Sequence, residues 1–537
     1  MDATRPPRAA PATGGSAARS TVGAAAPGPV TAGLRPDAAG RADAAGRADA
    51  AGRADAGRAD AAGRAGGVAI ETRSIDYVPA RERHGKVWHQ GPFWFTGNFV
   101  LTTMVTGFIG PALGLGLGWS VLAVVLGACF GTFLMAFHAN QGPRMGLPQM
   151  IQSRAQFGIR GAIVPFVSVV FVYVGFNVFN VVLATEGLQT VLPGGSTLWY
   201  AVLISIAIVL AVVGHDLLHL VQRWLTYALI AVFGVLSIGA MVNLDVATPA
   251  GGGGMSWTAF LVVFSGAAGY QISYAVYVSD YSRYLPADVP ARKVIWWTYA
   301  GAAGSAAWLM SLGALLASAL PDPDAIGAVR RVGNDIVPGF GTFAVLVSSL
   351  ALISIMAVNA YGAMLTTTSA IDAFRPVRPT VRVRVAGIVA IEAIVFVVAI
   401  VLPDDYLGSF NDFVLMMLYF LIPWTAVNLV DFYLVRRGHY AVTAIFDPRG
   451  IYGRWSWRGL TAYTVGFAAM IPFFKTSFFT GPVADALDGA DVSFVVGLLV
   501  GGALYAWLCR DLDLTAERAA ERASEAELEG ADAPLGV

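Results

Sequence analysis

The stretch Ser265-Gly266-Ala267-Ala268-Gly269-Tyr270-Gln271 decides how this chain can fold. It lies in an apolar run, residues 246–279, that contains no Asp, Glu, Lys or Arg. Glycine lowers helix stability and lets the backbone unwind, so that carbonyl and amide groups in this stretch can face a cavity. The same small residues also let two helices pack closely in a membrane. The sequence alone leaves both interpretations open.

The composition of the whole chain indicates a membrane protein. Of 537 residues, 56% are hydrophobic and 13% are charged, whereas soluble chains carry roughly 25% charged residues. The mean hydropathy is +0.63. Four uncharged runs are each long enough to cross a bilayer, which takes about 20 apolar residues: residues 87–143, 246–279, 294–321 and 336–371. A soluble enzyme is excluded, and a formal net charge of zero gives no basic surface for nucleic acid.

We predict an all-α polytopic membrane protein of about twelve transmembrane helices. The first predicted span has its own interruption, with Asn98, Thr102-Thr103 and Thr106-Gly107 at mid-depth. Interrupted first and sixth spans, five spans apart, are typical of a transporter built from two inverted repeats, with substrate between the broken helices. The predicted spans are residues 92–113, 117–139, 163–189, 196–214, 221–243, 256–278, 294–319, 339–370, 383–402, 407–434, 459–475 and 491–509.

The distribution of Lys and Arg predicts the orientation. Loops after odd-numbered spans carry only three such residues, Arg330, Arg331 and Lys475. The positive-inside rule therefore places the loops after even-numbered spans, and both termini, in the cytoplasm. We expect the protein to lie in the plasma (inner) membrane. The sixteen Lys and Arg residues of those loops are Arg144, Arg154, Arg160, Arg223, Arg283, Arg292, Lys293, Arg375, Arg378, Arg382, Arg384, Arg436, Arg437, Arg449, Arg454 and Arg458.

Two tails flank the membrane domain, which we assign to residues 86–510. Residues 1–85 form a low-complexity tail with a recurring Gly-Arg-Ala-Asp unit, as in Gly40-Arg41-Ala42-Asp43. This tail has almost nothing apolar to bury, so we expect it to be disordered. Residues 511–537 form a cytoplasmic C-terminal tail, in which the Ala-, Glu- and Arg-rich stretch 514–529 predicts a solvated, marginal helix.

Amides and aromatic rings inside the spans are candidate ligand-binding groups. Tyr173 and Asn177 in the third span are four residues apart, so they share one helical face. Asn359 in the eighth span and Gln271 in the sixth also need hydrogen-bond partners inside a bilayer. Such amides can bind one another across helices, or they can bind a flat polar ligand on which aromatic rings stack. The sequence does not decide between these alternatives.

Ionisable and thiol groups at depth are few. Glu392, near the middle of the ninth span, is a candidate proton carrier. A structural role in the scaffold is the alternative, because the ninth span is not one of the interrupted pair. Glu186 and Asp412 lie near the outer ends of their spans. Cys129 and Cys509 lie in apolar runs and indicate neither a disulfide framework nor a metal cluster.

Three motifs lie in loops and at span ends. The first is Gly142-Pro143-Arg144-Met145-Gly146-Leu147-Pro148-Gln149-Met150, continued by Gln152-Ser153-Arg154-Ala155-Gln156-Phe157-Gly158. The second closes the sixth span with Ser279-Asp280-Tyr281-Ser282-Arg283-Tyr284-Leu285-Pro286. The third is Pro423-Trp424-Thr425-Ala426-Val427-Asn428-Leu429-Val430-Asp431-Phe432-Tyr433, ahead of Arg436-Arg437-Gly438. In order and spacing the chain resembles the nucleobase:cation symporter family, purine-cytosine permease branch.

This resemblance implies a 5+5 inverted-repeat fold of the leucine-transporter type, with broken helices 1 and 6 and alternating access. Family members hold a planar heterocycle between an aromatic residue on span three and one on span six, with amides on spans three and eight. Tyr173 and Tyr270 correspond to the stacking positions, although Trp is usual on span three. The amides expected to hydrogen-bond the substrate are Asn177, Gln271 and Asn359.

The resemblance leaves the coupling cation open between H+ and Na+. Sodium-coupled members place hydroxyl groups on span eight, about one and a half turns before the amide. Ile353 and Ser354 occupy that place here, so one hydroxyl is present and one is absent. Ser354 is therefore the one side chain that we assign to cation binding.

We expect a secondary active transporter, not an enzyme, that imports cytosine, a purine or a related planar heterocycle by symport with H+ or Na+. Alternative cargoes are allantoin, a hydantoin and a heterocyclic vitamin such as thiamine or pyridoxine. Alternative classes are a channel and a membrane-embedded enzyme, which the broken-helix pair and the lack of clustered His, Asp or Glu at depth disfavour. We expect no catalytic residue, cofactor, nucleic acid or obligate protein partner, so the partners are the substrate and the lipid bilayer.

Overall fold

The computed structural model describes residues 76–532, with gaps at 214, 245–253, 321–323, 376, 378–379 and 404. Nearly all of the predicted N-terminal tail, residues 1–85, lies outside the described residues. Within the described ranges the ordered elements are helices, apart from one isolated bridge between Lys475 and Thr480. Apolar segments take this form in a membrane because a helix satisfies its backbone hydrogen bonds internally.

Each of the twelve predicted spans is helical in the structure. Eight helices of the described residues are long and apolar enough to cross a membrane, and shorter apolar helices accompany them. The first span is divided into α2 (Gln90–Asn98), α3 (Leu101–Thr106) and α4 (Ile109–Ala112). The other spans contain α5 (Leu117–Ala139), α9 (Ile163–Gln189), α10 (Ser196–Val213), α11 (His215–Asn243), α12 (Trp257–Ile272), α14 (Ala291–Ala319), α16 (Phe340–Asp372), α17 (Val381–Val401), α18 (Tyr406–Val430), α19 (Trp457–Met470) and α21 (Ser493–Leu508).

The helices of eight spans pack into two groups of four. In one group α5 packs against α12 and α14, and α14 also packs against α2. In the other group α9 packs along α16 and against α17, and α10 packs against α16 and α17. The first group therefore combines spans 1, 2, 6 and 7, and the second combines spans 3, 4, 8 and 9. Each group contains matching spans of the two repeats, which is the arrangement that the predicted fold class requires.

Glycines allow the first group to pack backbone against backbone. A Cβ atom at Gly107 would lie 1.9 Å from the carbonyl oxygen of Met310 on α14. A Cβ atom at Gly131 would lie 2.3 Å from the carbonyl oxygen of Ala268 on α12. Without a hydrophobic driving force between helices in lipid, such close contact is a main source of helix association.

The sixth span breaks later than the glycine stretch predicts. α12 continues through Gly266 and Gly269 to Ile272, because Gly269 serves close packing: its Cβ would lie 2.2 Å from the Val414 carbonyl oxygen on α18. The chain then forms a 3-10 turn, η3 (Ser273–Val276), and leaves helical geometry at Tyr277, where φ is −138° and ψ is 10°. The packing interpretation therefore holds for Gly269, and the interruption begins just after Ile272.

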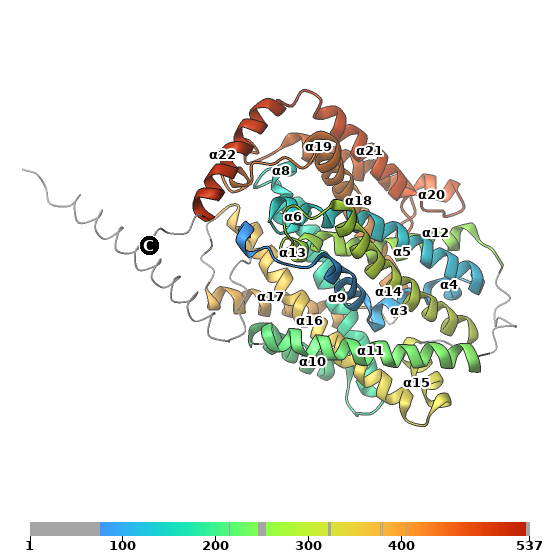
Figure 1. Ribbon diagram of the computed structural model, residues 1–537. Helices are drawn as coiled ribbons and strands as arrows, with labels where there is room; N and C mark the ends of the chain where they lie inside the picture. The colour runs from blue at the N-terminus through green and yellow to red at the C-terminus, as the bar shows by residue number, and fades with distance from the viewer. Residues whose placement is uncertain are drawn as a thin grey trace, which may run out of the picture. The chain divides into compact units, whose positions relative to one another are not determined.

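The C-terminal tail also differs from the prediction. The expected helix is present as α22 (Leu514–Asp532), the red helix in Figure 1. One face of it is docked: the Glu517 carboxylate accepts hydrogen bonds from Arg436 Nε and Nη2 at 2.8 and 2.9 Å, and Ser524 Oγ accepts one from the Thr443 amide at 3.0 Å. Periodicity could not reveal this docking, because the partners lie in the distant loop after α18.

The remaining helical elements lie in the connections or at span ends. The longest of them, α15 (Ala325–Ile336), packs against α11 and α16 and was not among the predicted elements. The others are η1 (Ala80–Glu82), η2 (Val87–His89), α6 (Gln141–Met145), α7 (Gln149–Gln152), α8 (Arg154–Phe157), α13 (Val278–Ser282), η4 (Asp431–Val435), η5 (Thr443–Ile445), η6 (Ile471–Phe473) and α20 (Pro482–Ala486).

Candidate functional site

The first helix breaks directly after Asn98. Phe99 and Val100 are not helical, and Val100 is extended, with φ −137° and ψ 160°. The carbonyl oxygen of Asn98, left without its helical partner, accepts a hydrogen bond from Thr103 Oγ1 at 2.7 Å. A hydroxyl group of α3 thus supplies a hydrogen-bond donor to the free carbonyl oxygen at the end of α2. Free backbone groups of an interrupted helix need such partners inside a membrane.

The two interrupted helices meet side chain to side chain. The amides of Asn98 and Gln271 exchange two hydrogen bonds, each 3.2 Å between nitrogen and oxygen. Thr103 Oγ1 lies 2.7 Å from the Tyr270 hydroxyl, and Thr132 Oγ1 donates to Gln271 Oε1 at 3.1 Å. The prediction that the interruptions of the first and sixth spans face each other is therefore confirmed.

A cavity of about 790 Å³ lies beside this junction. Four tyrosines of the sixth span line it, Tyr270, Tyr274, Tyr277 and Tyr281. They face the same cavity although the chain leaves helical geometry at Tyr277, between the second and the fourth of them. Trp94 of α2 packs against this row, with its ring centroid 6.0 Å from that of Tyr274 and 5.6 Å from that of Tyr281. One wall is therefore almost continuously aromatic.

Polar groups occupy the opposite wall. Asn180 accepts a hydrogen bond from Thr102 Oγ1 at 2.6 Å, and both residues line the cavity. Asn359 and Ser354 of α16 also line it, and Ser354 Oγ is buried without a hydrogen-bond partner among the described residues. Of the described residues that line the cavity, none is Asp, Glu, Lys or Arg. The cavity suits an uncharged, flat ligand with donors and acceptors on its edge.

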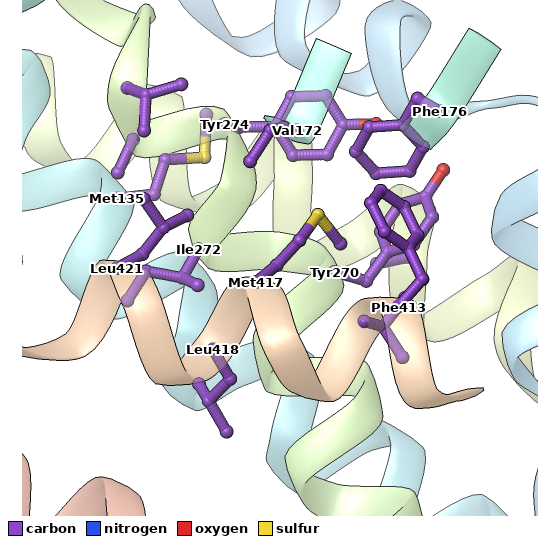
Figure 2. Packing of buried hydrophobic residues seen from close by; sticks show 14 of the residues in the cluster. Met135, Val172, Phe176, Tyr270, Ile272, Tyr274, Phe413, Met417, Leu418 and Leu421 are labelled. Carbon is purple, nitrogen blue, oxygen red and sulfur yellow. The ribbon is translucent and has the colours of Figure 1, made fainter. Parts of the chain in front are cut away.

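The cavity is closed at one end and open toward the other. At the closed end Phe176 packs edge to face against Tyr270 and Phe413, with ring centroids 5.3 Å apart in each pair. Figure 2 shows these three side chains together, with Met417 and Leu418 of α18 nearby. Trp88 lines the other end and is 49% exposed. A ligand therefore enters or leaves from the end where residue 88 lies.

The predicted site residues fall into two sets. Tyr173, Tyr270, Ser354 and Asn359 line the cavity, whereas Asn177 and Gln271 are fully buried behind its wall. The ring of Tyr173 is stacked on Tyr277, with centroids 5.7 Å apart and planes inclined by 18°. The sixth-span ring that covers Tyr173 is thus Tyr277 rather than Tyr270.

Asn177 lies in a chain of hydrogen bonds behind the wall. Its Nδ2 donates to the Met356 carbonyl oxygen at 2.9 Å and to Glu392 Oε1 at 2.6 Å. Its Oδ1 accepts a hydrogen bond from Asn359 Nδ2 at 3.0 Å. The interhelical bonding that the sequence left open as an alternative is therefore present for Asn177 and for Gln271.

Sequence reasoning missed Tyr274, Tyr277, Tyr281, Phe176 and Trp94 as cavity residues. A signal for the first three exists, because tyrosines at 270, 274, 277 and 281 repeat with helical spacing. Aromatic residues are common in membrane cores, and nothing in the sequence shows which neighbour faces Phe176 or Trp94.

Comparison with known proteins agrees with this architecture. The model of a family described as permeases for cytosine/purines, uracil, thiamine and allantoin matches residues 77–497. A Bacillus subtilis relative, YxlA, provisionally assigned as a purine-cytosine permease, is 40% identical over 442 residues, which are 81% of this chain and 95% of the relative. The chain belongs to this family of permeases. It is thus a multi-pass membrane transporter and not an enzyme, as the sequence predicts.

More distant relatives extend the comparison. The purine-cytosine permease fcyB of Emericella nidulans is 24% identical over 469 residues, which cover 82% of this chain and 88% of the relative. The solved structure of Mhp1 in an inward-facing conformation matches 87% of this chain and 99% of its own, with a TM-score of 0.67 and 18% identity. This likeness confirms the leucine-transporter type of inverted-repeat fold.

Proposed function

We propose that the protein imports a nucleobase, cytosine or a purine, or a related planar heterocycle, together with H+ or Na+. The proposed location is the plasma (inner) membrane, with both termini in the cytoplasm. The excess of Lys and Arg in the loops after even-numbered spans supports this orientation. The cavity then opens to the cytoplasm, at the end lined by Trp88 and His89.

The cavity itself carries the proposal. It joins stacked tyrosine rings, amide groups and hydroxyl groups, and none of the described residues that line it is Asp, Glu, Lys or Arg. A nucleobase is flat, uncharged at neutral pH and edged with hydrogen-bond donors and acceptors. The volume of about 790 Å³ lies within the range of small-molecule pockets, roughly 300–1,000 Å³.

Each predicted residue has a distinct part in this proposal. Tyr173 and Tyr270 contribute ring surface, and Asn359 presents its amide at the wall. Asn177 orients Asn359 from behind through the 3.0 Å hydrogen bond. Gln271 joins the two broken helices through Asn98. Both amides therefore act on the substrate through a neighbour rather than by direct contact.

Coupling in this proposal arises because substrate and cation favour the same occluded state. For Na+, Ser354 Oγ supplies one oxygen at the wall, while the neighbouring Ile353 supplies no side-chain oxygen. A site of this kind needs further oxygens from the backbone. Ser354 suits a sodium ion only as one ligand of several.

The second candidate cargo is another neutral heterocycle, such as allantoin. It is favoured by the same neutral lining, and the family description includes it. Thiamine carries a positive charge, and the described lining residues offer it no carboxylate. We therefore rank thiamine below the neutral cargoes.

The test combines binding and uptake. Purified protein is screened by thermal shift against cytosine, purines, uracil and allantoin, with and without sodium, because a ligand that binds the native state raises the melting temperature. In uptake assays, Tyr270→Ala and Asn359→Ala should abolish saturable transport while the protein remains folded. Tyr299→Ala, a partly exposed tyrosine of α14 outside the cavity lining, serves as the control. Normal uptake kinetics in both cavity variants would refute the site.

A further inference from the structure

A carboxyl group lies buried in the second helix group, outside the cavity. Glu392 of α17 has no exposed surface. Its Oε1 accepts a hydrogen bond of 2.6 Å from Asn177 Nδ2, while its Oε2 is buried without a hydrogen-bond partner among the described residues. A buried carboxylate oxygen with no donor is costly. Because ionisable groups inside a membrane are rare and mark functional sites, this carboxyl group is a candidate functional residue.

No basic side chain of the surrounding helices compensates this carboxyl group. α17 packs against α9, α10 and α16, none of which contains Lys, Arg or His. On α17 itself, Arg382 and Arg384 lie at its N-terminal end, at least eight residues away, or about 12 Å along the axis. The titratable groups on the three packed helices are Tyr173, Glu186, Tyr200, Tyr361 and Asp372.

Two hydrogen-bonded amides, Asn177 and Asn359, connect the carboxyl group to the cavity wall. An ionised carboxylate only accepts hydrogen bonds, so Asn177 must turn its NH2 group toward Glu392. Its oxygen then faces Asn359, whose NH2 group donates at 3.0 Å. This leaves the Asn359 oxygen as the group free to face the cavity that Asn359 lines. The Met356 carbonyl oxygen accepts from the same Asn177 NH2 group at 2.9 Å, so the carboxylate and this carbonyl together fix which amide atom the wall presents.

We propose that Glu392 is the binding site of the coupling proton. In the import cycle, a proton from water on the outer side adds to Oε2 and gives a neutral carboxylic acid. Protonation removes the charge that strengthens the hydrogen bond from Asn177 Nδ2, which loosens the amide pair that presents Asn359 at the wall. On the inner side the proton leaves to water and restores the carboxylate. Because proton and substrate act on the same amide pair, their binding is linked reciprocally. The inference rests on the proposed function and identifies its cation as H+.

The transport experiment uses full-length protein in liposomes with a pH gradient, acidic outside, and an entrapped pH dye. Wild-type protein should accumulate nucleobase and acidify the lumen only when substrate is added. Glu392→Gln keeps an oxygen that can accept a hydrogen bond from Asn177, so it should retain substrate counterflow when the pH is equal on both sides. It should lose both the accumulation driven by the pH gradient and the proton entry that depends on substrate. Glu392→Asp retains a titratable group and should keep part of the accumulation. Glu186→Gln, another carboxyl of the membrane domain, should behave as wild type.

The outcomes separate the proton site from the proposed function. Accumulation by Glu392→Gln at the wild-type level overturns the proton site, as does a wild type driven by sodium without proton entry. Absence of counterflow for every nucleobase in wild-type protein overturns the proposed function instead. In that case infrared difference spectra between acidic and alkaline buffer still decide the proton site. A carboxyl C=O band that titrates in wild type and is lost in Glu392→Gln supports it, and identical spectra overturn it. A monodisperse elution profile for each variant excludes misfolding.

Discussion

Two pairs of buried amides join matching spans of the two repeats, and they differ in what lies behind them. Asn98 and Gln271 connect spans one and six by two hydrogen bonds of 3.2 Å. Their other partners are neutral, the Ala302 carbonyl and the Thr132 hydroxyl. Asn177 and Asn359 connect spans three and eight, and behind Asn177 lies the carboxyl group of Glu392.

A hydrogen-bonded pair of amides therefore has a different role at each of the two places. The first pair closes on itself and cross-links the two broken helices at the point where their backbones unwind. The second pair connects a buried ionisable group to the cavity wall, so the strength of its hydrogen bonds depends on the charge of that group. A change at the first pair should alter stability at every pH, whereas a change at the second should depend on pH.

The largest effect is expected from Asn177→Leu. This change removes the one hydrogen bond that the described structure gives to the Glu392 carboxyl, and a hydrogen bond to a charged group contributes about 1.5–3 kcal/mol. The bond favours the ionised form, so its loss should cost more at alkaline than at acidic pH. Thermal unfolding, followed by tryptophan fluorescence over a pH series, measures this cost. Gln189→Leu, an amide at the exposed end of the same helix, is the control. A cost that is equal at all pH values would contradict the assignment.

A smaller effect, without pH dependence, is expected from Asn98→Leu. It leaves the Gln271 amide and the Ala302 carbonyl buried with fewer partners, which costs about 1–3 kcal/mol. The same unfolding series should show a parallel drop in melting temperature at each pH. Uptake should also fall, because the broken helices lose their cross-link. If the drop in melting temperature increased with pH, the Asn98–Gln271 pair would also be coupled to an ionisable group.

The smallest effect is expected from Thr103→Val. It removes the hydroxyl that bonds the Asn98 carbonyl and the Tyr270 hydroxyl, both neutral groups. Neutral hydrogen bonds contribute about 0.5–1.5 kcal/mol each, so the loss should be modest. Thr103→Ser keeps the hydroxyl and should retain wild-type stability. Destabilisation by Thr103→Ser but not by Thr103→Val would assign the role of Thr103 to its methyl group.

The sequence predicts the helices and their interrupted pair well, and the site less well. Tyr173, Tyr270, Ser354 and Asn359 line the cavity as expected. Asn177 shares a helical face with Tyr173 by spacing, yet it points past the wall to Glu392. Spacing fixes the face of a helix, but the depth of a side chain depends on which neighbours pack there.

The glycine stretch illustrates the same limit. Gly266 and Gly269 weaken a helix in isolation, but the contact of Gly269 with the Val414 carbonyl keeps α12 helical as far as Ile272. The interruption moves to the tyrosine-rich segment beyond, where Ser273 Oγ donates to the Tyr270 carbonyl oxygen at 2.6 Å. Local propensity marks a region as breakable, and packing decides the residue at which it breaks.

By itself the sequence determined that this protein is a helical membrane bundle with interrupted first and sixth spans, because uncharged runs and mid-span polar groups are local properties of the chain. Only the tertiary structure decided that four tyrosines form a wall, that the Asn177 and Gln271 amides stand behind the cavity rather than in it, and that Glu392 is connected to the wall through Asn177 and Asn359. These contacts join residues that are up to 215 positions apart in the chain. Hydrogen-bond partners at such separations are chosen by packing of the helices, which no local pattern specifies.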